Sequence, residues 1–565
     1  MSTFPWIAHY PKGVPAEIED QRPKNLLELY QNAFNQFGSR EAFENMGGVL
    51  TFQEVDQLST NFAAYLQNEL GMVKGDRIAI QMPNCLQYPV VLIGAVKAGC
   101  IVVNTNPLYT HREMEHQFND AGVKTIVIMA NFAKSLEEAM PNLSTVENII
   151  VTELGDMLGG LKGKIVNFVV KHIKKMVPAY KVPNPITLKS AMAKGARMKY
   201  TKPEIKGEDT AFLQYTGGTT GVSKGAILSH NNVVAHTLMI THVFKPLLKE
   251  GQKDIMITAI PLYHIFALNV NCTFMMHIGA KNVLITNPRD MPGFIKELKK
   301  HPFTLFTGVN TLFNGLLNQP NFKEIDFSHF KTSIGGGMAV QDAVAKKWQE
   351  MTGTPLVQGY GLSETSPVVC CNPLDGTHKR GTIGLPVPST ELAIYDDDGN
   401  RLAQGETGEI CVKGPQVMSG YWNKKNDGVF FEGGYFRTGD IGVMDEEGFF
   451  KIVDRKKDMI NVSGFNVYPN DVENAIADHP KVLEVAVIGV PDPHSTECVK
   501  AFIVKSDPSL TEEELREYCH ENLTGYKRPK HYEFRTELPK TNVGKILRRK
   551  LKEEEEARGK ELFKS

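Results

Sequence analysis

The chain has 565 residues, of which 42% are hydrophobic and 22% charged, and its formal net charge is −1. This length exceeds what one hydrophobic core usually serves, so two or more domains are expected, and the composition is that of a folded protein. The balanced charge excludes a nucleic-acid-binding protein driven by bulk electrostatics. The eight cysteines show no C-x-x-C spacing, which predicts no disulfide framework or zinc site and fits a reducing cytoplasm.

Neither secretion nor membrane insertion is predicted. Residues 1–15 lack a basic stretch followed by an apolar core, so no signal peptide is expected. The longest apolar run, residues 88–103, is interrupted by Pro89, Lys97 and two glycines, and it is too short to span a bilayer. The expectation is a cytoplasmic protein, with at most peripheral contact at the inner face of the cytoplasmic membrane.

Helix and strand patterns alternate through the first 340 residues. Residues 51–54 form a capping box, and the apolar residues that follow recur at helical spacing: Val55, Leu58, Phe62 and Leu66. Short apolar strands are predicted at residues 77–82, 125–129, 255–260, 282–285 and 304–307. This alternation indicates layered α/β architecture.

Residues 161–181 form a basic amphipathic segment. The apolar residues that would share one helical face are Ile165, Val169, Ile173 and Met176, and the lysines elsewhere on the helix are Lys171, Lys174 and Lys175. Two interpretations stay open. The helix could lie in an anionic lipid interface, or it could be an ordinary surface helix packed on its own domain.

The most distinctive segment runs from Tyr215 to Gly225 and follows an apolar stretch that predicts a strand. Its glycines allow consecutive N–H groups to point into one anion-binding concavity, while short hydroxyl side chains and Lys224 add donors and positive charge. It is not a Walker A loop, because Ser223 occupies the slot of the second glycine and Gly225 follows Lys224. The segment predicts a polyphosphate cradle, with a flexible surface linker as the alternative.

The last third of the chain divides into two parts. Short β-like runs separated by turn residues occupy about 380–453 and predict a small antiparallel or barrel-like unit. A charge run at residues 454–458 precedes a new alternation of helices and strands. We therefore expect an N-terminal domain at 1–454, a hinge at 455–459 and a C-terminal domain at 460–565. The charged tail from Arg548 onward predicts a solvated helix.

Five further motifs follow the phosphate loop in a fixed order. They are residues 261–266 (PLYHIF), 335–338 (GGGM), 360–365 (YGLSET), 435–440 (YFRTGD) and 539–545 (PKTNVGK). With the loop, this ordered set resembles the adenylate-forming superfamily of acyl-CoA ligases, luciferases and peptide-synthetase adenylation domains. The similarity covers about residues 50–550 and is greatest to bacterial long-chain fatty-acid–CoA ligases.

The resemblance implies a fold and a reaction. The fold is α/β, with a large N-terminal domain of two α/β sheet layers plus a small β-barrel-like unit, and a small mobile α+β C-terminal domain. The reaction joins a fatty acid to AMP from ATP, releases pyrophosphate, and then transfers the acyl group to coenzyme A. The implied partners are the fatty acid, ATP, Mg²⁺ and coenzyme A, without nucleic acid. Homodimerisation and membrane contact through Leu161–Lys181 are further expectations.

The resemblance also implies the nucleotide site. The phosphate-binding residues would be Thr216, Gly217, Gly218, Thr219, Thr220, Gly221 and Lys224. Adenine would lie between the glycines Gly335, Gly336 and Gly337 on one side and Tyr360, followed by Gly361, on the other. Glu364, with Thr216, would hold Mg²⁺, a cation that prefers carboxylate oxygen. Thr365 would contact the α-phosphate, and Asp440 with Arg455 would bind the ribose.

Four more positions receive implied roles. Lys545 would bridge the α-phosphate and the carboxylate as a cationic, electrostatic catalyst. His264 would gate the site or line the acyl pocket. Lys457 would be the hinge between the two steps, and the backbone of Gly464 would line the pantetheine tunnel. Asn461 departs from a pattern in which some relatives carry a second lysine, so the source of charge in the second step stays open.

Each of these residues also has an ordinary structural interpretation. His264 could be a core histidine, Glu364 a capping carboxylate, Asp440 a turn residue, Lys457 part of a solvated charge run, and Lys545 one more lysine of a basic tail. Residues 266–276 fit either an acyl channel or a core helix. The rival functions are a medium-chain or aryl-acid CoA ligase, a ligase that charges a carrier protein, and a non-catalytic acyl or nucleotide sensor.

Overall fold

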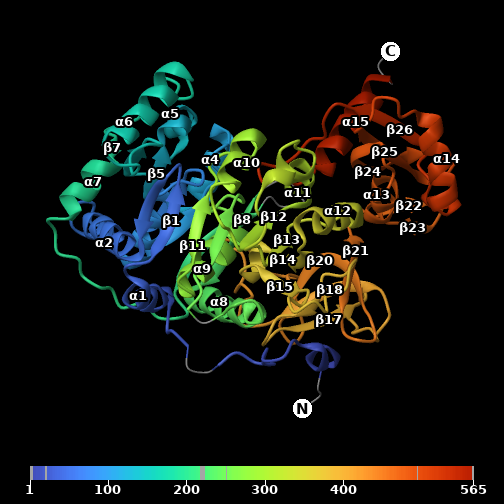
Figure 1. The fold of residues 1–565 in the computed structure, drawn as a ribbon, viewed down its shortest axis with the longest axis horizontal. Helices are drawn as coiled ribbons and strands as arrows, with labels where there is room; N and C mark the ends of the chain where they lie inside the picture. Colours follow the sequence, from blue (N-terminus) through green and yellow to red (C-terminus); the bar gives the residue numbers. More distant parts are fainter. Residues whose placement is uncertain (1–3, 20–21, 217–222, 250, 493, 563–565) are drawn as a thin grey trace.

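The computed structural model describes residues 4–19, 22–216, 223–249, 251–492 and 494–562. Two large sheets, a small β unit and a separate C-terminal α+β part follow one another along the chain (Figure 1). The predicted fold class is confirmed. The strands expected at 77–82, 125–129, 255–260, 282–285 and 304–307 appear within two residues of those bounds.

The first large sheet has seven strands in the order β7-β6-β5-β3-β4-β8-β9. Their bounds are β7 (Ile186–Thr187), β6 (Asn148–Thr152), β5 (Thr125–Met129), β3 (Arg77–Gln81), β4 (Ile101–Asn104), β8 (Thr210–Thr216) and β9 (Lys224–Ser229). All neighbours are parallel except the β8–β9 hairpin. Every residue of β5 is buried, as expected for a parallel strand covered on both faces.

The second large sheet has nine strands and is parallel from β14 to β1. In spatial order they are β16 (Leu385–Pro386), β15 (Val368–Cys371), β14 (Leu356–Gly361), β13 (Thr332–Gly335), β12 (Leu305–Gly308), β10 (Ile255–Thr258), β11 (Lys281–Leu284), β1 (Glu41–Asn45) and β2 (Gly48–Thr51). Parallel strands bring their carboxyl ends to one edge, so the ends of β13 and β14 present the GGGM and YGLSET motifs together.

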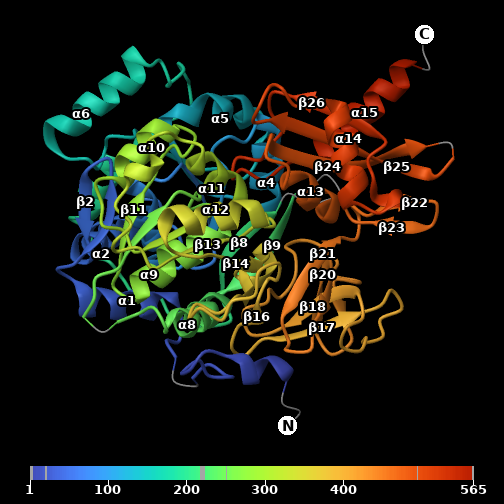
Figure 2. The same cartoon turned by 45° about the vertical axis from the view of Figure 1, so that its right-hand side comes forward.

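Helices pack around and between these sheets (Figures 1 and 2). They are α1 (Leu26–Phe37), α2 (Phe52–Asn68), α3 (Gln87–Lys97), α4 (His111–Ala121), α5 (Ala133–Ala139), α6 (Gly160–Phe168), α7 (Leu188–Gly195), α8 (His230–Phe244), α9 (Phe274–His277), α10 (Met291–Leu298), α11 (Asn310–Leu317) and α12 (Asp342–Thr352). The predicted capping box at Thr51 starts α2. Residues 267–273 form a buried π-helix that leads into α9, so the 266–276 segment is core helix.

The β unit and the C-terminal part each contain five strands. The antiparallel β unit comprises β17 (Glu391–Tyr395), β18 (Gly408–Lys413), β19 (Phe430–Phe431), β20 (Tyr435–Met444) and β21 (Phe450–Arg455). The C-terminal part comprises β22 (Ile460–Val462), β23 (Phe465–Val467), α13 (Pro469–Ala477), β24 (Val482–Asp492), β25 (Thr496–Lys505), α14 (Glu512–Asn522), β26 (His531–Arg535) and α15 (Arg548–Leu562). Two buried clusters lie wholly between residues 460 and 551, so this part has a core of its own.

Two helix predictions need correction. The helix predicted at 161–181 ends at Ile173. Its last turn, Val169–Ile173, is π-helical, and Lys175 then leaves helical geometry with a positive φ of 51°. Met176 therefore lies beyond the helix, and the predicted apolar face is not continuous. The C-terminal helix is not purely solvated, since Leu551 is completely buried. Within the described ranges, no helix is both long and apolar enough to cross a membrane.

Candidate active site

The phosphate-loop segment connects the two strands of the β8–β9 hairpin. Thr216 pairs with Lys224 at the last register position before the loop. Gly217, Gly218, Thr219, Thr220 and Gly221 lie outside the described residues. The ammonium of Lys224 lies 5.3 Å from the ring centroid of Tyr421, which fixes its direction by a cation–π contact. Lys224 is thereby held at the end of the loop.

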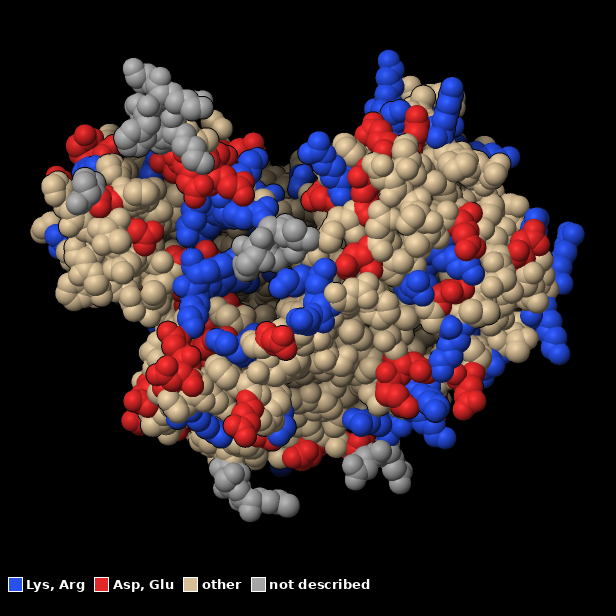
Figure 3. Space-filling view, turned by 180° about the vertical axis from the view of Figure 1, so that it is seen from behind, with Lys and Arg blue, Asp and Glu red and all other residues tan. Residues whose placement is uncertain are grey.

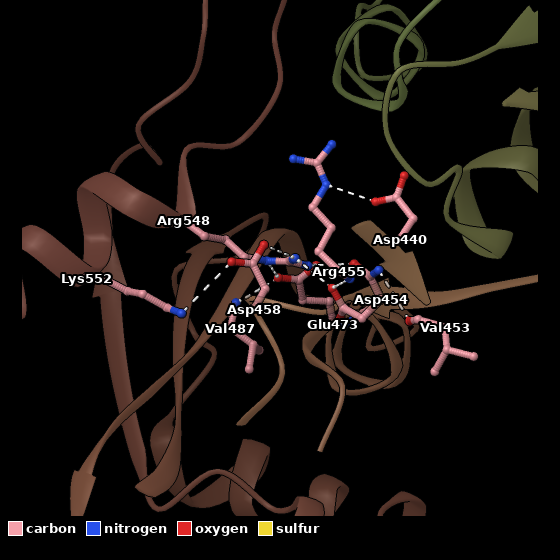
Figure 4. A network of polar contacts seen from close by, with 10 residues as sticks. Asp440, Val453, Asp454, Arg455, Asp458, Glu473, Val487, Arg548 and Lys552 are labelled. Carbon is pink, nitrogen blue, oxygen red and sulfur yellow. Dashed lines mark hydrogen bonds and ion pairs between the residues drawn. The ribbon is translucent and has the colours of Figure 1, made fainter. Parts of the chain in front are cut away.

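Tyr360, Asp440 and Arg455 form a polar triad at the junction of β14, β20 and β21. The Tyr360 hydroxyl donates to Oδ2 of Asp440 at 2.6 Å. Figure 4 shows the other contact, in which Nε of Arg455 lies 3.3 Å from Oδ1 of Asp440. Asp440 and Arg455 are paired residues of the β20–β21 ladder, so the backbone register sets their approach. Asp440 is only 5% exposed. A carboxylate held in this way can accept two hydroxyls, which suits a ribose.

Glu364 lies in a short 3₁₀ turn directly after β14. It is 8% exposed, burial raises the pKa of its carboxyl, and the Tyr421 hydroxyl donates to its Oε1 at 2.8 Å. Tyr421 therefore contacts both predicted charged groups, Lys224 and Glu364. Sequence reasoning missed Tyr421, because a tyrosine in an irregular segment carries no periodic signal.

Thr365 forms its hydrogen bonds within its own turn. Its hydroxyl is completely buried and donates to the carbonyls of Leu362 and Pro367 within the turn. Short hydroxyl side chains favour such local backbone bonds. The predicted contact of Thr365 with an α-phosphate therefore stays a prediction, and such a contact would compete with these bonds. Ser363, two residues earlier in the same turn, is partly exposed.

A buried histidine and a buried asparagine form hydrogen bonds to the backbone just after the Glu364 turn. Sequence reasoning missed both residues. Nε2 of His236 accepts the Val368 N–H at 2.9 Å, and the Asn269 amide donates to the Ser366 carbonyl at 2.6 Å. The Asn269 amide also lies 2.8 Å from Nδ1 of His236. Burial lowers the pKa of His236 to about 3, so the ring is neutral, and its unprotonated Nε2 can accept the Val368 N–H. These contacts fix the backbone that follows Glu364.

Lys545 reaches the same site from the C-terminal part of the chain. A Cβ added to Gly337, which has a φ of +80°, would lie 3.0 Å from Cε of Lys545 and 3.5 Å from its Nζ. Burial lowers the pKa of Lys545 to about 8, with the charge of Arg455 adding to the effect and the carboxylates of Asp440 and Glu364 opposing it. The ammonium therefore stays mostly protonated at neutral pH.

The predicted adenine glycines and His264 border this lysine. Burial, together with the positive charge of Lys545, lowers the pKa of His264 to about 3, so His264 is neutral. Its Nδ1 accepts the N–H of Phe266 at 3.3 Å. A Cβ on Gly336 would approach the Phe266 ring to 3.0 Å, so only glycine fits there without a shift. Gly335 ends β13 beside Gln358 of β14.

An ion-pair network surrounds the predicted hinge (Figure 4). Arg548 donates to both oxygens of Glu473, at 2.9 and 2.6 Å, and its Nη1 lies 3.3 Å from the completely buried Asp454 and 3.6 Å from Asp458. Lys457 lies between these two aspartates in an exposed turn. The network therefore holds Asp454 and Asp458, which lie on either side of Lys457 in the sequence.

The hairpin between β22 and β23 contains the other predicted positions. Ser463 and Gly464 both have positive φ, 52° and 88°, and form a two-residue turn. Oδ1 of Asn461 accepts the Gly464 N–H at 2.8 Å, so Asn461 acts here as a turn-capping residue. A Cβ on Gly464 would meet nothing within 4 Å, and the turn is open to solvent.

The electrostatics of the site favour anions. Figure 3 shows the molecule hollowed between its two lobes, with Lys and Arg side chains gathered along the hollow. Among the residues that the structure describes, no group of three or more His, Cys, Asp and Glu could hold a metal ion. A single carboxylate, Glu364, suits Mg²⁺ that is bound mainly through phosphate oxygens and water.

Comparison with known proteins gives two family matches and close relatives. Residues 30–422 match the AMP-binding enzyme family, and residues 471–545 match the AMP-binding enzyme C-terminal domain. A long-chain-fatty-acid–CoA ligase of Salmonella typhimurium is 55% identical over 556 residues, covering 98% of each chain.

Solved structures are similar over almost the whole chain. An anthranilate CoA ligase in complex with anthranoyl-AMP has a TM-score of 0.83 at 24% identity, covering 97% of this chain and 99% of the other. ATP-bound MatB of Rhodopseudomonas palustris has a TM-score of 0.77 at 26% identity, covering 94% and 98%.

Proposed function

The chain belongs to the AMP-binding enzyme family, and we propose that it is an ATP- and Mg²⁺-dependent long-chain fatty-acid–CoA ligase that works through acyl-AMP. The observation that carries the proposal is the convergence of Lys545, Glu364 and Asp440 near the loop end of the hairpin that bears Lys224. The 55% identical relative of Salmonella typhimurium is a long-chain-fatty-acid–CoA ligase, which supports the choice of a long-chain acid.

In the first step, a carboxylate oxygen of the fatty acid attacks the α-phosphorus of ATP, and pyrophosphate leaves. Two anions must meet, so the chain has to supply positive charge and fixed donors. We assign Lys545 to the α-phosphate and the attacking carboxylate, Lys224 to the departing phosphates, and Asp440 with Arg455 to the ribose. Glu364 would hold Mg²⁺, which neutralises phosphate charge when bound.

In the second step, the thiolate of coenzyme A attacks the acyl carbon, and AMP leaves. The neutral ring of His264 borders the site and is assigned to gating the acyl group, since it carries no charge to stabilise an anion. Rotation at Lys457 would withdraw Lys545 and bring the Gly464 turn, which is open to solvent, toward the thiol. Arg548 is occupied by its carboxylate partners and is not assigned to the phosphates of coenzyme A.

Pyrophosphate release across a panel of acids tests the function. With C16 or C18 fatty acids, ATP and coenzyme A, we expect AMP and pyrophosphate at a kcat/KM about tenfold or more above that for C8 acid or benzoate, because each extra buried methylene adds binding energy. Without coenzyme A, a single burst of pyrophosphate should remain. ADP as the product would contradict the proposal, and a preference for benzoate or C8 acid would replace the long-chain assignment.

We also propose that the segment 160–176 contacts anionic lipid. Helix α6 projects at the rim of the molecule (Figure 2). Its large apolar side chains are exposed: Leu161 73%, Ile165 52% and Phe168 59%, followed by Ile173 64% and Met176 54%. No acidic residue occurs between Met157 and Pro203, while lysines are frequent there. Apolar side chains beside lysines suit an anionic bilayer surface.

Vesicle flotation tests the lipid contact. The double variant Ile165→Ser/Phe168→Ser should reduce the fraction floating with phosphatidylglycerol vesicles about tenfold, because it removes exposed apolar area. The matched control Val73→Ser/Leu108→Ser removes two side chains of similar exposure, 62% and 52%, far along the chain and should float like the wild type. Equal flotation of both variants would leave α6 an ordinary surface helix.

A further inference from the structure

Helix α11 presents two polar side chains, one turn apart, to the C-terminal part of the chain. The hydroxyl of Thr311 donates to the carbonyl of Gly544 at 2.8 Å, and the amide of Asn314 donates to the carbonyl of Leu483 at 2.9 Å. Residues three apart lie on one helical face, so both bonds arise from a single surface of α11. One of them ends on the residue that directly precedes Lys545.

The turn that receives the Thr311 bond is itself rigid. The Gly544 N–H donates to the Thr541 carbonyl at 3.0 Å, and the Thr541 N–H donates to the Lys545 carbonyl at 2.7 Å. The Lys545 N–H donates to the Thr541 hydroxyl at 3.0 Å. Because the turn is closed by its own bonds, fixing the Gly544 carbonyl also fixes the backbone of Lys545.

Gly544 and Thr311 approach each other too closely for any other residue at 544. Gly544 has a φ of +84°, and a Cβ there would lie 2.8 Å from Oγ1 of Thr311 and 3.2 Å from Cγ2 of Val309. The turn is therefore seated directly on the first residues of α11.

Helix α11, which carries the two donor side chains, is also anchored. Asn310 and Gln341 exchange two hydrogen bonds of 3.0 Å, which tie the start of α11 to the segment that follows the GGGM motif. Phe313 is completely buried with its ring centroid 4.8 Å from that of Trp348. Helix α11 is thus fixed in the core of the large domain, with the Thr311 hydroxyl pointing at the lysine turn.

We propose that Thr311 and Asn314 are positioning residues that hold the C-terminal domain so that Lys545 lies in the site during adenylate formation. The inference rests on the proposed function, because it assigns the two bonds to the first step only. The second step does not use Lys545 at the α-phosphate, so the thioester reaction should not depend on Thr311 or Asn314.

The half-reactions are measured separately to test this. ATP–pyrophosphate exchange with a long-chain acid reports the first step, and thioester formation from supplied acyl-AMP and coenzyme A reports the second. Thr311→Val, which removes the donor and keeps the shape, should lower kcat of exchange about tenfold, because small displacements of a catalytic group are costly. The KM for ATP and the second step should stay within about twofold, because neither needs the bond.

Two further variants, a control and one chemical readout make the test specific. Thr311→Ser restores the hydroxyl and should restore exchange, and Thr311→Val/Asn314→Leu should lower it further. Gln319→Ala, just after the end of α11, removes an amide that donates to the Gly315 carbonyl and should not change exchange. Labelling of Lys545 by an amine-reactive ester, followed by mass spectrometry, should rise severalfold in the double variant as the turn detaches.

The outcomes separate this inference from the proposed function. If the wild type shows no acid-dependent exchange, the proposed function fails, and Lys545 labelling alone then decides whether the two side chains hold the turn. Wild-type exchange and labelling in Thr311→Val/Asn314→Leu would overturn the inference. An equal loss of both half-reactions would overturn it too, because a general folding defect has that signature.

Discussion

Replacing Lys545 with alanine should slow acyl-adenylate formation by about a hundredfold to a thousandfold, the usual cost of removing one preorganised electrostatic contact. In the structure the ammonium lies beside Gly337, close enough for the charges of Arg455, Asp440 and Glu364 to act on its pKa. Thioester formation from supplied acyl-AMP should stay within about threefold of the wild-type rate, because only the first step needs this charge. Both half-reactions should be measured on one preparation, so that the loss in adenylate formation can be compared directly with the loss in thioester formation.

The pH dependence of the first step offers a second measurement on the same lysine. Burial lowers the pKa of Lys545 to about 8, so the fraction of free enzyme with the cationic lysine decreases as the pH rises through that value. We expect kcat/KM for adenylate formation to decrease over the same range. Lys545→Arg keeps its charge throughout and should show no decrease near pH 8. A Lys545→Ala variant that adenylates normally would remove Lys545 from the mechanism.

The sequence predicted the framework of the site because its signals are local. A capping box, buried strands and an ordered series of short motifs each depend on neighbouring residues, and the resemblance supplied their roles. The ends of β13 and β14 then bring two of those motifs to one edge of a sheet. Parallel topology made that convergence predictable.

The residues that the sequence did not reveal are those that act across long separations. Tyr421 reaches Glu364 from 57 positions away, and Thr311 reaches Gly544 from 233. Neither has a spacing that marks it, since such contacts arise only when the sheets and domains pack. The α-phosphate contact of Thr365 stays a prediction, and the local hydrogen bonds inside its turn compete with any such ligand.

Replacing Arg548 with leucine should lower the free energy of unfolding of the C-terminal domain by about 3–5 kcal/mol, because it leaves buried carboxylates without their partner. The guanidinium is 15% exposed and binds both oxygens of Glu473, while Asp454 beside it is completely buried. Hydrogen exchange of the β24 and β25 amides is the suitable measurement, since a chain with several cores need not unfold in two states. The Val487 N–H, which donates to Glu473 at 2.8 Å, reports the site directly.

Arg549, the residue next to Arg548, provides a matched control. Arg549 is 56% exposed and pairs with Glu553 on the surface at 3.2 Å. Such a pair contributes little, so Arg549→Leu should change the same exchange free energies by less than about 0.5 kcal/mol. Similar losses in both variants would mean that the aliphatic stem or helix propensity, and not the buried charge, determines the effect.

The loss of unfolding free energy in Arg548→Leu should depend on pH if it comes from an unpaired carboxylate, and should not if it comes from lost packing. Burial raises the pKa of Asp454 to about 6, and the positive charge of Arg548 opposes that rise, so the pKa should be higher still in the variant. The folded state then holds this proton more tightly than the unfolded chain, whose aspartate titrates near 4, and stability is lost as the pH rises from about 4 through the folded pKa. Lowering the pH from 7 to 5 should therefore restore part of the stability lost in Arg548→Leu, relative to the wild type at each pH. A deficit that stays constant or grows on acidification would show that lost packing, and not an unpaired carboxylate, weakens the domain.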